Sequence, residues 1–187
     1  MSLERGSARL DLPPSRKTRA LLAYLAVTGR PHRRERLCDL LWDVPDDPRG
    51  ALRWSLSKLR ALVDEPGANR LIADRESVAF DLADVRVDVL EARRALADTL
   101  DDLSVDELRG LAAMFAGEFL EGLDLPDCSE FHSWCIAERG NARALHLRLL
   151  SQLVDRLKQR PREAIEFARR QVAIDPHDES SWATLVR

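Results

Sequence analysis

The sequence is poor in cysteine and has no long apolar run, and both absences exclude whole classes of protein. Its three cysteines, Cys38, Cys128 and Cys135, are too few and too unevenly spaced for the disulfide framework of a small secreted domain. No apolar stretch approaches the roughly 18 residues of a membrane-spanning helix, and residues 1–5 lack the apolar segment of a secretory signal. We therefore expect a cytoplasmic protein without a membrane partner.

The motifs of common enzyme sites are also missing. The chain has no glycine-rich phosphate loop, no Gly-x-Ser-x-Gly nucleophile elbow and no His-Glu-x-x-His zinc motif, and its four histidines are scattered. Acidic pairs such as Asp101 and Asp102 fall in predicted turns. We therefore expect a protein that is not an enzyme and that uses no cofactor.

Charge is divided unevenly between the two halves of the chain. The 187 residues are 45% hydrophobic, enough for one large or two small domains with a real core. Residues 1–87 carry 16 Lys or Arg and 13 Asp or Glu, a net charge of +3, whereas residues 88–187 carry 13 and 19, a net charge of −6. Within residues 16–60 the counts are 11 and 5. A phosphate-binding surface concentrates positive charge in this way, and so does an ordinary solvated basic surface.

The first half has the pattern of a strand, three helices and a hairpin. Residues 7–13 alternate as a short edge strand does, and apolar residues at helical spacing then predict three helices, over 16–28, 33–42 and 48–64. After Pro66 and Gly67, alternation over 70–73 and 77–82 predicts a β-hairpin. Elements in this order form a winged helix-turn-helix, in which the third helix enters the major groove of DNA.

The predicted third helix has the clearest start and two distinct faces. Asp46 and Asp47 offer a capping carboxylate, and Pro48 fits the first helical position. The apolar stripe consists of Leu52, Leu56, Leu59 and Val63, and the opposite face of Arg49, Arg53, Ser57 and Arg60, flanked by Trp54 and Lys58. The helix is thus predicted to bury one face and to present a basic one.

Beyond residue 87 the strong signals are helical. Ser104 and Glu107 have the spacing of a capping box. The segment 118–127 contains Gly122 and Pro126 and is predicted to be a loop. Helices are predicted over 88–97, 104–117, 129–158 and 161–174, with a further one starting at 179.

These segments resemble a known family of bacterial regulators. Residues 12–26 (LPPSRKTRALLAYLA), 34–42 (RERLCDLLW) and 51–60 (ALRWSLSKLR) are similar to the OmpR-like winged helix of antibiotic-pathway (SARP-type) transcriptional regulators. Val87 to Val89, residues 117–123 and Trp134 are similar to the bacterial transcriptional activator domain of that family, and residues 164–182 resemble the helix junction of a tetratricopeptide repeat.

The resemblance implies a fold class, a division and a function. It implies an α+β winged helix-turn-helix domain over residues 1–87, followed by an all-α, tetratricopeptide-like activator domain over 88–187. The strands that lead the family's first domain are nearly absent before residue 7 and the helical domain stops inside a repeat, so we expect a part of a longer protein. The implied function is sequence-specific DNA binding that activates transcription. The implied partners are double-stranded DNA, transcription machinery or another protein, and a second copy on direct repeats.

Nine side chains are predicted to contact DNA. The resemblance places helix 48–64 in the recognition position, where arginine suits guanine edges and lysine suits phosphates. Arg60 has an alternative in an ion pair with Asp64, and Trp54 packs either under the wing or against sugar. Arg75 is predicted at the wing tip, between Asp74 and Glu76, which weaken the local field. Arg33 and Arg34 are predicted phosphate contacts at the start of helix 33–42, with a solvated role as the alternative. The full set is Arg33, Arg34, Arg49, Arg53, Trp54, Ser57, Lys58, Arg60 and Arg75.

Two alternatives follow from the same residues. Cys128, His132 and Cys135 have a spacing that places three soft ligands on one side of a helix, but no fourth ligand is evident, so we predict no metal site. A protein-interaction scaffold that has lost DNA binding is the rival function, which the sequence pI of about 5.9 permits. If Asp43, Asp46, Asp47 and Glu76 interrupt the basic stripe, the scaffold is favoured.

Overall fold

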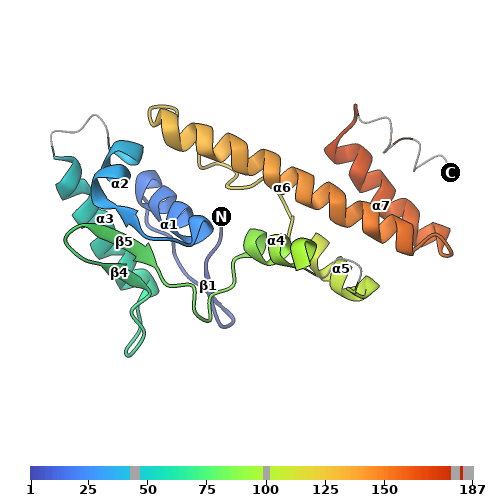
Figure 1. The fold of residues 1–187 in the computed structure, drawn as a ribbon, viewed down its shortest axis with the longest axis horizontal. Coiled ribbons are helices and arrows are strands. Elements are labelled where there is room, and N and C mark those ends of the chain that lie inside the picture. The colour runs from blue at the N-terminus through green and yellow to red at the C-terminus, as the bar shows by residue number, and fades with distance from the viewer. Residues whose placement is uncertain (43–46, 99–101, 178–181, 183–187) are drawn as a thin grey trace. The chain divides into compact units, whose positions relative to one another are not determined.

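The chain forms two compact units, drawn in Figure 1. The computed structural model describes residues 1–42, 47–98, 102–177 and 182. The first unit comprises Met1–Val87 together with Leu120–Ile136, and the second comprises Asp88–Phe119 and Ala137–Arg187. The sequence pattern had assigned everything after residue 87 to one domain, whereas the structure groups residues 120–136 with the first unit.

Three helices lie in the first segment of the first unit. They are α1 (Arg16–Thr28), α2 (Arg34–Leu41) and α3 (Pro48–Val63). The side chain of Ser15 caps α1 by accepting from the Thr18 N–H, and Gly29 ends the helix in the left-handed conformation that glycine favours. The Asp47 carboxylate accepts from the Gly50 N–H at the start of α3. These local signals explain why the helix boundaries agree closely with the predicted ones.

Two small antiparallel sheets complete the first unit. Strands β1 (Glu4–Arg5) and β2 (Ala8–Arg9) form a hairpin. The second sheet has the order β3 (His32–Arg33), β5 (Ser77–Phe80), β4 (Leu71–Ala73), so the predicted hairpin is present and has a third strand on its edge. Arg33 therefore lies in β3, and α2 begins one residue later than predicted. A two-residue strand is too short to show alternation, and this is why the sequence did not reveal it.

The core of the first unit combines the helices with residues from much later in the chain. The predicted stripe of α3 is buried, as are Leu21, Leu25, Leu37 and Leu41 of the other helices. The segment 120–136 adds Leu123, Leu125, Cys128, Phe131 and Cys135 to the same core. Its Trp134 ring lies edge-on to Tyr24 of α1, with centroids 5.0 Å apart. The segment is therefore an integral part of this unit's packing.

The regular secondary structure of the second unit is all helical in its described residues. It contains α4 (Asp88–Asp98), α5 (Val105–Ala113), the later part of α6 (Ser129–Arg156) and α7 (Pro161–Ile174). Its core consists of Ala92, Leu96, Leu108, Ala112, Leu149, Leu150 and Leu153. Helix α5 ends at residue 113 rather than near 117, and the helix predicted from 179 falls outside the described residues except for Trp182. The mixed α+β start and the helical second part are thus as predicted.

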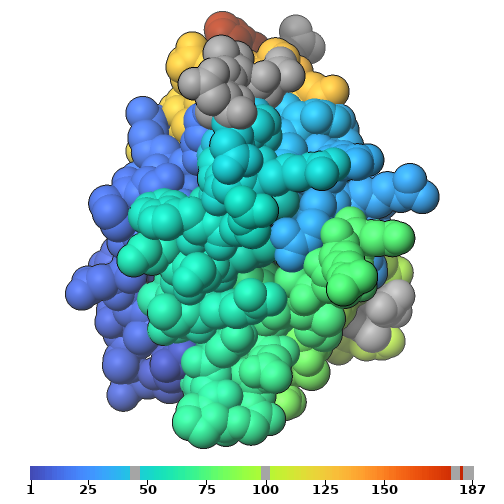
Figure 2. Space-filling view, turned by 90° about the vertical axis from the view of Figure 1, so that its left-hand side faces the viewer, coloured from blue at the N-terminus to red at the C-terminus, as the bar shows by residue number. Residues whose placement is uncertain are grey.

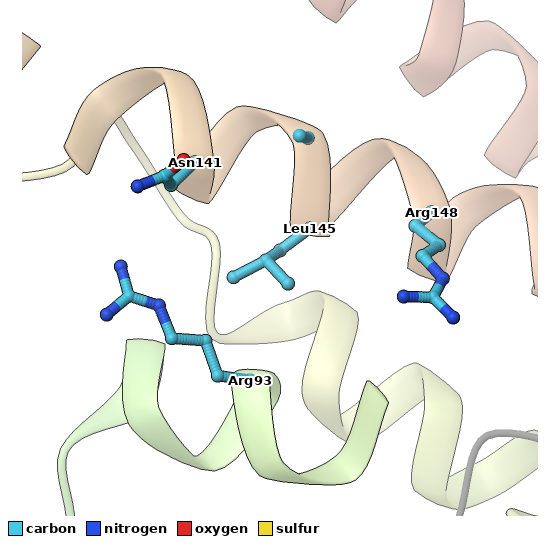
Figure 3. A pocket seen from close by; sticks show the side chains of 5 residues that line it. Arg93, Asn141, Leu145 and Arg148 are labelled. Carbon is cyan, nitrogen blue, oxygen red and sulfur yellow. The ribbon is translucent and has the colours of Figure 1, made fainter. Parts of the chain in front are cut away.

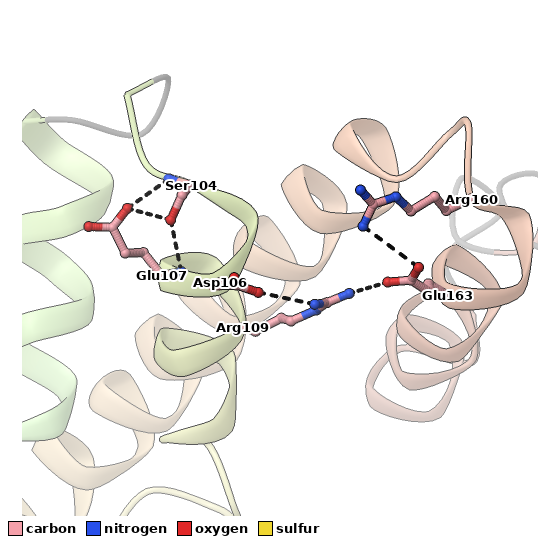
Figure 4. A network of polar contacts seen from close by, with 6 residues as sticks. All are labelled: Ser104, Asp106, Glu107, Arg109, Arg160 and Glu163. Carbon is pink, nitrogen blue, oxygen red and sulfur yellow. Dashed lines mark hydrogen bonds and ion pairs between the residues drawn. The ribbon is translucent and has the colours of Figure 1, made fainter.

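Polar contacts connect α5 with α7 in the second unit (Figure 4). The predicted capping box is present: the Glu107 N–H donates to the Ser104 hydroxyl, and the Glu107 carboxylate accepts from the Ser104 N–H. On the other side of α5, Arg109 bridges Asp106 and Glu163, and Glu163 also pairs with Arg160 at 3.8 Å. Among the described residues, no helix has both the length and the apolar character that a membrane span requires.

Candidate nucleic-acid interface

A basic groove lies on the first unit between α2, the beginning of α3 and the β4–β5 hairpin. Figure 2 shows this face, with α3 in cyan to teal, α2 in light blue and the hairpin in green. The groove has a volume of about 1030 Å³ and is lined by Arg33, Arg34, Glu35, Arg49, Leu52, Arg53, Ala73, Asp74, Arg75 and Glu76. Five of the nine predicted site residues, all arginines, therefore line one groove, opposed by three carboxylates.

Strand pairing brings the start of α2 to the hairpin. Because β3 pairs with β5, the Arg34 N–H donates to the Glu76 carbonyl at 2.8 Å, and the Arg34 Nε donates to the Asp74 carbonyl at 2.8 Å. Arg33 is exposed beside it. Arg34, predicted as a phosphate contact, thus also holds the hairpin turn against α2, a role that the sequence did not indicate.

The hairpin turn is fixed by Asp74. Its Oδ1 accepts from the Glu76 and Ser77 N–H groups, each at 2.7 Å, and its Oδ2 accepts from the Ser77 hydroxyl at 3.0 Å. These hydrogen bonds, together with the nearby Arg34 charge, hold the pKa of Asp74 below its ordinary value. Arg75 is exposed at the tip, and its guanidinium makes no hydrogen bond or ion pair with any described residue. The turn therefore presents Arg75 on a hydrogen-bonded support.

The two arginines at the start of α3 are each paired with an acid. Arg49 Nη2 lies 3.2 Å from Glu35 Oε1, and both side chains are more than 70% exposed. Arg53 Nη2 lies 3.7 Å from Asp47 Oδ2, also in solvent. Exposed pairs of this kind contribute only about 0 to 1 kcal/mol, so they are easily opened. The sequence indicated Asp47 as a cap but gave no sign of these pairs.

Farther along α3, Trp54, Ser57 and Lys58 are exposed and lie outside the groove lining. Trp54 is 50% exposed, and Lys58 Nζ lies 5.6 Å from the centre of its ring, within the range of a cation–π contact. The neighbouring Ser55 is buried instead. Trp54 therefore does not pack under the hairpin, which leaves its ring available for an outside contact.

Arg60 is exposed on α3, and its predicted alternative is wrong. The Asp64 Oδ1 accepts from the Arg70 and Leu71 N–H groups at 2.8 and 3.0 Å, and so anchors the start of β4. No ion pair joins Arg60 to Asp64 in the described part of the chain. The Asp64 carboxylate bonds to the backbone instead, because the following turn brings the Arg70 and Leu71 N–H groups to it.

The cysteines belong to the core of the first unit. Cys128 and Cys135 are buried, and the Cys128 Sγ–H donates to the Leu41 carbonyl at 3.5 Å. Cys38 is also buried, and burial raises the pKa of its thiol. Within the described ranges, no group of three His, Cys, Asp or Glu side chains is arranged to hold a metal ion.

The second unit has a shallower hollow and a half-buried histidine. Arg93 of α4 and Asn141, Ala144, Leu145 and Arg148 of α6 line an open hollow of about 340 Å³, with Leu145 between the two arginines (Figure 3). Arg93 is already paired with Glu138. Nearby on α6, His146 stacks on Phe115 and accepts from Arg170 at 3.2 Å. Burial, together with the Arg170 charge, lowers the pKa of His146 to about 4.

The fold and the groove define a class of protein. One unit is α+β, with helices and small antiparallel sheets, and carries an arginine-lined groove; the other unit of the chain is helical. In comparisons with known proteins, no protein-family model and no curated protein matches this chain.

Proposed function

We propose that the chain is a sequence-specific DNA-binding regulator of transcription, in which the first unit is a winged helix and the second a tetratricopeptide-like activator domain. The observation that carries the proposal is the groove that gathers Arg33 of β3, Arg34 of α2, Arg49 and Arg53 of α3, and Arg75 of the β4–β5 turn. Guanidinium groups bind phosphates and guanine edges in bidentate geometry. A duplex is a partner whose charge suits such a groove.

In the proposed complex, α3 lies in the major groove. Arg53, Ser57 and Lys58 then face base edges and phosphates, and Trp54 packs against sugar or a thymine methyl group. The hairpin places Arg75 at the flanking backbone or minor groove, as a wing does. The exposed ion pairs of Arg49 and Arg53 open on binding, since phosphate oxygens replace the carboxylates.

The scaffold remains the second candidate function, and the interleaved acids favour it. Of the predicted interrupting acids, Asp47 and Glu76 lie beside the basic side chains, whereas Asp43 and Asp46 fall outside the described residues. Glu35 and Asp74 also interrupt the positive surface. A protein partner with mixed charges would complement such a surface as well as a duplex would. The two candidates differ in sequence selectivity and in salt dependence.

The test is selection of bound sequences from a random duplex pool by the full chain, at low and at moderate salt. The proposal expects a recurring motif that persists at moderate salt, because base contacts survive when the phosphate contribution falls. An Arg53→Ala variant should lose the motif, whereas Arg162→Ala, which removes an exposed arginine from α7, should retain it. Recovery of no motif, with binding that disappears as salt rises, would favour the scaffold.

A further inference from the structure

Glu35 is an acid in a basic groove, and it lies in the first turn of α2, where the positive end of the helix modestly favours a negative charge. Its side chain is 72% exposed, and among the described residues its carboxylate contacts only Arg49, at 3.2 Å. An exposed ion pair of this kind contributes little to folding stability. The charge of Glu35 therefore costs the fold little to remove, and its place on the groove lining bears on what the groove binds.

The other acids beside the arginines differ from Glu35. Asp47 and Asp74 accept hydrogen bonds from the backbone, and Glu76 pairs with no arginine among the described residues. Asp47 pairs with Arg53 but also caps α3, and a side chain at position 50 would collide with its carboxylate. Both oxygens of Asp74 hold the hairpin turn. Glu76 makes no ion pair with any described residue. Glu35 is thus the groove acid whose described contacts serve only to neutralise an arginine.

We propose that Glu35 is a specificity-determining residue that occupies the phosphate-binding position at Arg49 and limits the affinity of the groove for the DNA backbone. The inference rests on the proposed function. A phosphate that approaches Arg49 competes with the carboxylate for Nη2 and stays beside its negative charge, within the screening length of physiological salt. Backbone contacts supply nearly all of the affinity for unrelated DNA but only part of the affinity for a specific site. Weakening them leaves base contacts to decide which duplexes stay bound.

The experiment compares Glu35→Gln with a matched control. Glu65→Gln removes the same charge from another exposed glutamate–arginine pair, that of Glu65 with Arg5, which does not line the groove. Affinity of the full chain for a short duplex of scrambled sequence is measured over a series of salt concentrations. Circular dichroism establishes that the variants are folded.

We expect Glu35→Gln to bind the scrambled duplex about 3- to 10-fold more tightly at roughly 0.1 M salt, with a salt slope steeper by about 0.9, the contribution of one added phosphate contact. Glu65→Gln should stay within about twofold of the parent, with an unchanged slope. In an Arg49→Ala background, adding Glu35→Gln should change affinity by less than about twofold, because the arginine it releases is gone.

Each other outcome is decisive. If Glu35→Gln behaves like Glu65→Gln while the parent still binds and Arg53→Ala weakens binding, the inference on Glu35 is wrong and the proposed function stands. If the parent and Glu35→Gln both fail to bind any duplex at low salt, both are wrong. Binding by Glu35→Gln where the parent shows none supports the inference.

Discussion

The hydroxyl groups of Thr18 and Ser55 lie 2.9 Å apart and share a hydrogen bond inside the first unit. Both residues are buried, and the bond joins α1 to α3 among leucines. A buried hydroxyl that loses its partner pays the full cost of desolvation, whereas a bonded pair is close to neutral. The pair is thus a buried polar contact between α1 and α3 within an apolar core.

We expect Ser55→Ala to lower the free energy of unfolding by about 1 to 3 kcal/mol, because the Thr18 hydroxyl is left without a partner. The double variant Thr18→Val, Ser55→Ala should recover part of that loss. Urea denaturation followed by circular dichroism measures both, with Ser57→Ala on the exposed face as the control. A double variant less stable than the sum of its single variants would contradict the explanation.

Arg53 is predicted to contact a base. Its side chain is 68% exposed, and among the described residues it is held only by a 3.7 Å pair with Asp47, so a base edge can replace the carboxylate at little cost. Arg53→Ala should weaken binding to the selected duplex by about 1 to 3 kcal/mol and relax base preference at one position. Titration against the selected duplex and its single-base variants checks this, with Arg162→Ala for comparison. Uniform weakening on every duplex would instead assign Arg53 to phosphate.

Phe131 is predicted to stabilise the first unit, although it is 44 residues beyond Val87, the last residue of that unit's main segment. Its side chain is fully buried in the core that α1, α2 and α3 also form. Phe131→Ala should cost about 3 to 5 kcal/mol of unfolding free energy. Ile136→Ala on the same helix, where the side chain is 55% exposed, should change it by less than about 0.5 kcal/mol. Equal effects of the two variants would show that the segment does not belong to this core.

His146 should make the second unit less stable in mild acid. The pKa of His146 is about 4 in the folded chain and near 6.5 when unfolded, so between these values only the unfolded chain takes up the proton. The contribution of His146 to the free energy of unfolding is fully present above about pH 6.5 and is lost as the pH is lowered toward 4. Since the ring is half-buried, we expect the loss to be about 1 to 2 kcal/mol rather than the full shift. His146→Gln, which keeps an acceptor for Arg170, should remove that part of the pH dependence, and unfolding at a series of pH values measures it.

Local signals made the helices predictable, and contacts between distant residues explain what was missed. Ser15 with Gly29, and Asp47 with Pro48, mark helix ends in the sequence itself, so α1 and α3 were predicted closely. The pair of Glu35 and Arg49 was not predictable, because each residue lies on its own helix and only packing brings them together. The same holds for Arg34 and the hairpin. Residue types and periodicity indicate which face is basic but not which acids stand opposite it.

The segment 120–136 shows this limit most clearly. Gly122 and Pro126 marked it as a loop, and its leucines have no spacing that names the core they enter. In the structure the segment is tied to the first unit by contacts of high sequence separation, such as Arg16 with the Gly122 carbonyl and Arg36 with Glu130. Sequence patterns predict local structure, between residues close in the chain, far better than they predict contacts between distant segments.

The late arrival of this segment has a consequence during synthesis. The core of the first unit stays incomplete until residue 135 has left the ribosome, by which time the whole of α4 and α5 has already been made. Until then the apolar sides of α1 and α2 that meet the segment are uncovered, and the nascent chain exposes them to chaperones and to other chains. Contacts between residues this distant in sequence form slowly. The first unit, which carries the groove, therefore finishes folding only after part of the helical unit has been synthesised.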